Sequence, residues 1–145
     1  MPHDHDHDHA RSGAPAHDGP AQEVLMNRFS FPHERLDAWH RAREARQLAL
    51  QFTASLPPGF SDESRQINKA AGSVVRNTCE GASRWRPAEK VLKFEIAQGE
   101  AGEVAGAIQS LLDVPVGDIE LGEQAIERMG RTSAILGGLI RRHRR

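Results

Sequence analysis

Basic residues grouped around a single tryptophan are the feature of this sequence best suited to binding chemistry. Lysine and arginine neutralise phosphates, and an aromatic ring stacks on a base, so the combination meets the minimum requirement for RNA binding. Runs of charge are more often a solvated helix face, and in that reading Trp85 packs beneath the connector. The predicted nucleic-acid-binding residues are Arg65, Lys69, Arg76, Arg84, Trp85, Arg86, Lys90, Lys93, Arg141 and Arg142.

The last two of these residues open the densest basic run, which ends the chain as RRHRR at 141–145. The run suits phosphate binding, and it equally suits neutralisation of the negative end of a helix. Both readings remain open at the level of sequence.

Histidines alternate with aspartates at the start of the chain, as His3, His5, His7 and His9. Neutral imidazoles and carboxylates are ligands for zinc, nickel and copper. A low-complexity chain offers no preorganised geometry, so the sequence predicts weak metal binding by these histidines at most, and no cofactor.

No residues are spaced as a catalytic centre requires. The sequence contains no phosphate-binding or dinucleotide glycine motif, no HExxH and no Cys/His zinc spacing. Cys79 has no histidine near it in the sequence, so a small buried side chain is expected rather than a nucleophile. Asn77 and Glu80 are expected to cap backbone groups or to pair with a cation of a neighbouring subunit. We therefore expect a protein that is not an enzyme.

Composition favours one lean domain. Of 145 residues, 38% are hydrophobic and 5% are aromatic, so a small core is expected to leave apolar surface for other subunits. The 20 acids and 19 bases are unevenly placed: residues 1–25 hold five acids and one base, which leaves 15 acids and 18 bases for 26–145. One cysteine, no long apolar run and no signal-peptide layout favour a cytoplasmic protein without a membrane partner.

Apolar residues at steps of three and four predict four helices and no strand. The expected ranges are 33–56, 61–81, 87–113 and 118 to the basic C-terminus. Residues 1–25 have almost nothing apolar to bury and are predicted to be disordered. Short connections between long helices favour an all-α, antiparallel up-down-up-down four-helix bundle over residues 26–145.

The ends of these helices carry local signals. Proline at 57 and 58 stops the first helix, and Ser61 is a suitable N-cap for the second. Gly81 is expected to adopt the left-handed conformation that ends a helix. Pro87 suits the first position of the third helix, and the fourth begins near Asp118.

Three glycines share one face of the third predicted helix, each at a cost of about 1 kcal/mol relative to alanine. Such a face is expected where another backbone approaches closely, either within the chain or from a second subunit. The predicted oligomer interface comprises Gly99, Gly102, Gly106, Asn77 and Glu80.

Several motifs together resemble a known bacterial family of four-helix-bundle proteins. It was first noticed in intervening sequences of 23S ribosomal RNA genes, and it includes the accessory variability protein of diversity-generating retroelements. The similar segments are QINKAAGSVVRNTCEG at 66–81, LDAW at 36–39, IAQG at 96–99 with Glu103, and LGGLIR at 136–141. The resemblance covers about residues 29–142. Val75 replaces a usual proline, Arg76 a small residue and Glu100 a serine, so helix kinking and the subunit surface are expected to differ.

This resemblance implies a homo-oligomer, commonly a pentamer, without known catalytic activity. In the retroelement relative it implies a basic surface that works with a reverse transcriptase and nucleic acid. The hypothesis that follows is an oligomeric accessory protein for RNA or a ribonucleoprotein. The alternatives are a protein-interaction scaffold without a nucleic-acid role, and weak metal binding by the N-terminal histidines.

Overall fold

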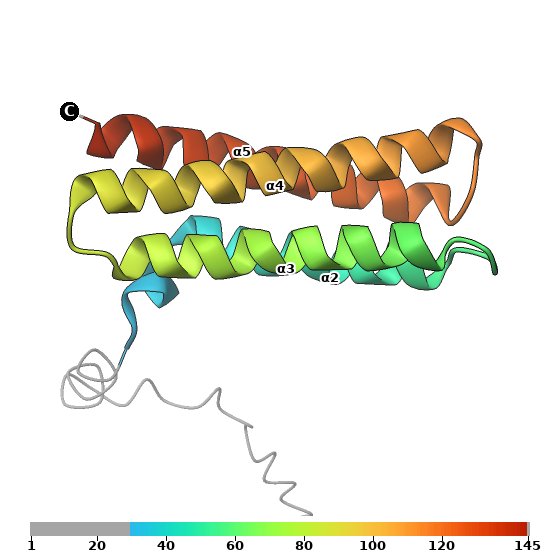
Figure 1. The fold of residues 1–145 in the computed structure, drawn as a ribbon, viewed down its shortest axis with the longest axis horizontal. Helices are drawn as coiled ribbons and strands as arrows, with labels where there is room; N and C mark the ends of the chain where they lie inside the picture. Colours follow the sequence, from blue (N-terminus) through green and yellow to red (C-terminus); the bar gives the residue numbers. More distant parts are fainter. Residues whose placement is uncertain (1–29, 145) are drawn as a thin grey trace, which may run out of the picture. The chain divides into compact units, whose positions relative to one another are not determined.

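The computed structural model describes residues 30–144, which form four long α-helices preceded by one 3-10 turn (Figure 1). Within these residues no strand occurs, and the predicted all-α fold is confirmed. The elements are η1 (Pro32–Arg35), α2 (Asp37–Ala54), α3 (Ser61–Ser83), α4 (Pro87–Asp113) and α5 (Ile119–His143). The predicted disordered segment 1–25 and its histidines His3, His5, His7 and His9 lie outside the described residues.

Successive helices run antiparallel, and each packs against two neighbours in the cyclic order α2, α3, α4, α5 (Figure 1). The α3–α4 connector, η1 and the end of α5 lie at the same end of the bundle. This end, with the connector residues 84–86 at its tip, is called the 84–86 end below. None of the described helices combines the length and apolar character that crossing a membrane requires.

The core is built around an alanine face on α2, because Ala38, Ala42, Ala45 and Ala49 are all fully buried. Small side chains let the neighbouring helices approach α2 closely. The larger buried side chains come from all four helices: Phe52, Ile67, Phe94, Ile108, Met129 and Leu136. The lean core expected from composition is therefore present, with alanine filling much of it.

Each pair of neighbouring helices is joined by at least one side-chain polar contact. Such contacts fix the rotation of each helix about its axis, because a slip would leave polar groups unpaired. Four of them, one for each pair, are Arg128 Nε to Glu44 Oε1 (2.6 Å), Thr53 Oγ1 to Asn68 Oδ1 (2.9 Å), Lys93 Nζ to Glu80 Oε2 (2.9 Å) and Gln98 Nε2 to the Ser133 carbonyl (3.0 Å).

The first predicted helix is divided in the structure. Leu36 is extended (φ −90°, ψ 119°) and separates η1 from α2, so the prediction of one helix over 33–56 is wrong in its first turn. Leu36 packs beside the core cluster that contains Val91 and Phe94, and this burial holds the break. The helix also ends two residues early, at Ala54, ahead of the prolines.

Gly81 and Ser61 also differ from prediction. Gly81 is buried and helical, and α3 continues to Ser83. The position requires glycine for packing, because the Phe94 ring occupies the space of a side chain: a Cβ on Gly81 would lie 2.6 Å from Phe94 Cε1. Ser61 is the first helical residue, and Phe60 holds the cap position without a side-chain hydrogen bond.

The remaining helix ends agree with the sequence. Pro87 opens α4, which runs to Asp113 as predicted. Asp118 caps α5, and its Oδ1 accepts a hydrogen bond from the Leu121 N–H (3.0 Å). α3 is a single helix through Val75, consistent with the absence of the family's usual proline there.

Gly81→Ala is expected to lower the free energy of unfolding by about 1–3 kcal/mol, because the added methyl must displace the buried Phe94 ring. Gly130→Ala is the matched control: a Cβ there meets nothing within 4 Å, so helix propensity should raise stability by up to about 1 kcal/mol. Urea denaturation of both variants measures the difference. A stabilised Gly81→Ala would contradict the packing described here.

Candidate nucleic-acid interface

A three-residue connector between α3 and α4 forms the tip of the 84–86 end. The Arg84 N–H donates to the Glu80 carbonyl (3.1 Å), and Arg84 then turns extended (φ −75°, ψ 146°). Arg86 is also extended (φ −81°, ψ 132°), and its carbonyl accepts from the Glu89 and Lys90 N–H groups (3.0 and 3.1 Å). The backbone on both sides of Trp85 is therefore fixed by the two helices.

Trp85 points into solvent, with 94% of the residue exposed. The interpretation that it packs beneath the connector is wrong. Trp39, the other tryptophan, is half-buried, with the Arg43 guanidinium 4.5 Å from its ring centre and the His33 ring at 4.4 Å. Because exposing an indole to water is unfavourable, a ring held at a fixed tip suits contact with a partner.

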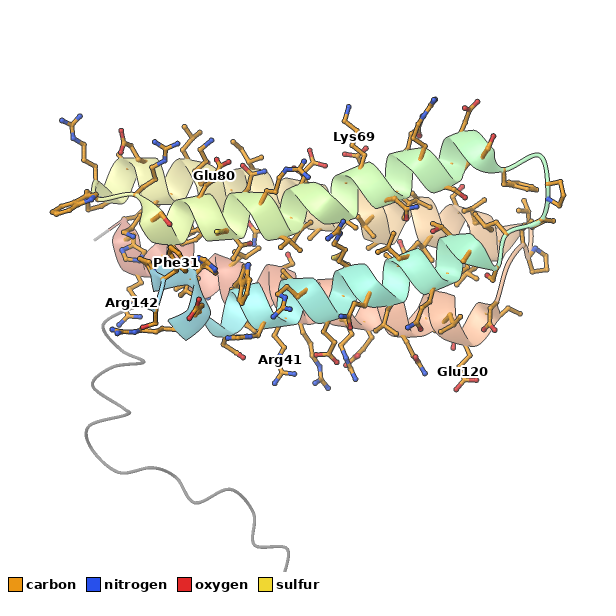
Figure 2. The ribbon with its side chains drawn as sticks, turned by 90° about the horizontal axis from the view of Figure 1, so that it is seen from below. Phe31, Arg41, Lys69, Glu80, Glu120 and Arg142 are labelled. Carbon is orange, nitrogen blue, oxygen red and sulfur yellow. The ribbon has the colours of Figure 1, made fainter. Side chains whose placement is uncertain are left out.

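Four arginines at this end are exposed: Arg84, Arg86, Arg141 and Arg142. None of them forms an ion pair with a carboxylate among residues 30–144. Figure 2 places Arg142 at the same end as Glu80, the residue whose carbonyl ends α3. The 84–86 end thus combines Trp85 with four cations whose charge remains available.

The rest of the C-terminal basic run is partly engaged. Arg144 pairs with Glu95 of α4, and the His143 ring lies 6.2 Å from the Phe94 ring. Burial, together with Lys90 and Arg142, lowers the pKa of His143 below its ordinary value, which favours its neutral form near neutral pH. Arg145 lies outside the described residues.

Two of the predicted binding residues hold the helices together. Lys90 Nζ donates to the carbonyls of Gly81 (3.2 Å) and Ala82 (2.9 Å), which have no partner within α3. Lys93 pairs with Glu80 at 2.9 Å and lowers the pKa of that carboxyl. The structure therefore gives Lys90, Lys93 and Glu80 contacts within the chain.

The other three predicted cations lie away from this end. Arg65 pairs with Asp62 at 3.1 Å near the start of α3. Lys69 and Arg76 line an open groove of about 470 Å³ between α3 and α4, together with Gln66, Ala70, Ser73, Glu100 and Glu103. The ten predicted residues therefore do not form one surface.

Two carboxylates in that groove oppose its cations. Burial and the neighbouring Glu103 raise the pKa of Glu100, while Lys69 and Arg76 act in the opposite direction. Charges of both signs share the groove, so a phosphate there would meet repulsion as well as attraction.

The predicted glycine face is open. A Cβ on Gly99, Gly102 or Gly106 would meet nothing within 4 Å, so the explanation by a tight crossing within the chain is wrong. The same side of α4 exposes 56% of Leu92 and 38% of Ile96. These five residues are called the outer face of α4 below. Asn77, placed in the same predicted interface, donates to the Ser73 carbonyl and Oγ (both 2.9 Å) on its own helix.

The sequence did not predict a contact between a cysteine and a histidine. Cys79 Sγ lies 3.3 Å from His33 Nδ1, and Cys79 is only half-buried, so the expectation of a small buried side chain with no histidine in reach is wrong. The two residues are 46 positions apart, and η1 brings them together, which no local pattern indicates. Burial, with the Glu80 charge, raises the pKa of Cys79, which favours the unreactive thiol. Among residues 30–144, no group of three or more ligands suited to a metal ion occurs.

Residues 34–138 match the family model described as 23S rRNA-intervening sequence protein. The chain belongs to this family. The match confirms the resemblance carried by the motifs, and it spans α2, α3, α4 and most of α5. Arg141 and Arg142 lie beyond the matched range, whereas the 84–86 connector lies within it. No curated protein sequence matches the chain.

Cys79 is expected to react with iodoacetamide more slowly in the folded protein than after unfolding, and its rate should rise with pH above the range of an ordinary thiol. The raised pKa keeps the thiolate scarce at neutral pH. Alkylation rates from mass spectrometry across a pH series test this. His33→Gln should leave the rate nearly unchanged. Rapid alkylation near pH 7 that requires His33 would instead indicate an activated nucleophile.

Proposed function

We propose that this protein is a non-enzymatic accessory protein that binds structured RNA through its 84–86 end and works as a homo-oligomer. One observation carries the RNA proposal: Trp85 is almost fully exposed at a fixed tip between two arginines that have no ion-pair partner among residues 30–144. The family's name, which refers to an intervening sequence of 23S rRNA, supports the same class of ligand.

The dipoles of the four helices nearly cancel at the 84–86 end, so the charge that a ligand meets there comes mainly from the arginines. α3 and α5 finish here with their negative ends, and α2 and α4 begin here with their positive ends (Figure 1). Lys90 neutralises the end of α3 through its contacts with two carbonyls. The charges of Arg84 and Arg86 at the tip therefore favour an anionic ligand.

RNA binding at this end should depend steeply on salt. If four arginines each neutralise one phosphate, the logarithm of the affinity should fall with the logarithm of salt at a slope of roughly −3, from about 0.7–0.9 per contact. Arg84→Ala/Arg86→Ala should reduce the slope by about 1.5 units, from about 0.7–0.9 per contact, and weaken binding. Fluorescence anisotropy with a labelled, structured ribosomal RNA fragment measures both quantities.

Arg65→Ala is the matched control for charge, since Arg65 lies at the opposite end of α3 and already pairs with Asp62. It should leave affinity and slope almost unchanged. Equal effects of the two changes would place the binding surface elsewhere. Absence of any binding at low salt would end the RNA proposal.

The outer face of α4 supports self-association. α4 is apolar on two sides: Phe94, Ala97, Val104 and Ile108 face the core, while Leu92 and Ile96 face outward beside the open glycines. A helix that is apolar on two sides requires two partners. The bundle supplies one of them, and a second copy of the chain supplies the other in this proposal; the pentamer implied by the family resemblance is one such assembly.

Gly102→Gln is expected to dissociate the oligomer while the monomer stays folded, because the new side chain enters space that is open within the chain. Gly130→Gln is its matched control: Gly130 is also helical, exposed and open, but it lies on α5. Analytical ultracentrifugation gives the mass, and circular dichroism reports folding. Loss of assembly in both variants, or in neither, would exclude this face as the contact.

A protein-interaction scaffold without an RNA role is the second candidate. The exposed Leu92 and Ile96 favour it, since the same apolar surface would suit a different protein. A protein that remains a monomer and binds no RNA, yet retains a partner through the outer face of α4, would support the scaffold.

A further inference from the structure

Trp85 is held in place before any partner arrives. The residues on either side are extended and end in helices, and the hydrogen bonds at Glu80 and Arg86 anchor both ends of the connector. Pro87, at the first position of α4, further restricts the backbone. A ring presented by a fixed backbone loses little conformational entropy when a ligand stacks on it.

Both faces of the Trp85 ring are open toward the described part of the chain. No ring or guanidinium of residues 30–144 stacks on it, and the residue is 94% exposed. Trp39 differs in this respect, because Arg43 and His33 pack against its ring and stabilise it within the fold.

The neighbours of Trp85 favour a nucleic acid over an apolar protein surface. Arg84 and Arg86 flank the ring in sequence, and both are exposed and without an ion pair among residues 30–144. Guanidinium groups suit phosphate oxygens, and they are costly to bury against apolar side chains. A nucleotide presents a base next to its phosphates, so the ring can contact the base while the two arginines contact the phosphates beside it.

A paired base does not offer its face to such a ring. Inside an A-form helix both faces of each base are covered by neighbours, and opening the stack costs several kcal/mol per step. Unpaired bases in loops, bulges and ends have an exposed face, and aromatic side chains bind there.

We propose that Trp85 stacks on an unpaired base, so that the ligand of the 84–86 end is an RNA that exposes an unpaired base beside a helical stem. This inference rests on the proposed RNA function and specifies the class of RNA. The arginines hold the backbone of the stem, and the indole selects the unpaired nucleotide.

The test compares two RNAs of equal length and equal phosphate number, one fully paired and one with an internal unpaired loop, on the full-length protein. Trp85→Leu should weaken binding of the looped RNA by about 5- to 150-fold, the range expected for loss of one base–aromatic stack, and should change affinity for the paired RNA by less than about twofold. Trp85→Phe should restore most of the preference, because phenylalanine keeps a stacking face.

A direct readout comes from 2-aminopurine at the unpaired position, whose fluorescence should be quenched by the wild-type protein and not by Trp85→Leu. Arg84→Ala/Arg86→Ala should weaken both RNAs by similar factors, which separates backbone binding from stacking. Circular dichroism checks that each variant keeps the helices.

The outcomes separate the two proposals. Salt-dependent binding that Trp85→Leu weakens equally for both RNAs, or leaves unchanged, would overturn the stacking inference and leave the RNA function intact. Absence of binding to either RNA would overturn both. If Trp85→Leu instead lowers the mass in analytical ultracentrifugation, the ring belongs to a protein contact and the inference is wrong.

Discussion

The contact between Gly81 and the Phe94 ring is the constraint on which the 84–86 end depends. Because glycine leaves room for the ring, α3 and α4 approach closely where they meet, and α3 remains helical to Ser83. The close approach brings Lys90 within reach of the last α3 carbonyls. The connector is then too short to fold back over its own residues, and Trp85 stays in solvent. Phe94 also lies against His143, so one ring orders three helix ends.

Alanine on α2 and glycine on α4 are small for different reasons. The α2 alanines are fully buried, and they let α3 and α5 close around a core with few large side chains. The α4 glycines are exposed, and no side chain of the described residues covers them. Each glycine costs helix stability of about 1 kcal/mol, which the monomer does not recover. A second surface against the outer face of α4 would recover it through close packing.

Local signals predicted the elements well where the responsible interaction is itself local. Pro87 and Asp118 act on their own backbone, so the starts of α4 and α5 could be read from the sequence. The role of Gly81 could not be read in this way, because a glycine suits both a left-handed helix end and a close helix contact. The second applies here, since the ring of Phe94, 13 positions later, packs against Gly81. In the candidate site, sequence identified the cations but not their partners, so Lys90 and Lys93 were predicted to bind nucleic acid. The contact of Cys79 with His33 depends on η1 and lies beyond any local pattern.

The proposed RNA-binding surface and the proposed oligomer contact both involve α4, and their proximity affects how tightly an assembly would bind RNA. α4 begins at the 84–86 end and carries its outer face along its length (Figure 1). One such end offers four arginines without an ion pair among residues 30–144 and one ring, a small number of contacts for a highly charged ligand. Copies joined through α4 would hold several of these ends at fixed spacing. The second end to engage would then bind at a high effective concentration, which multiplies a weak single contact without adding any new one. In this proposal, the few contacts that each end offers and the lean monomer core both favour action in several copies.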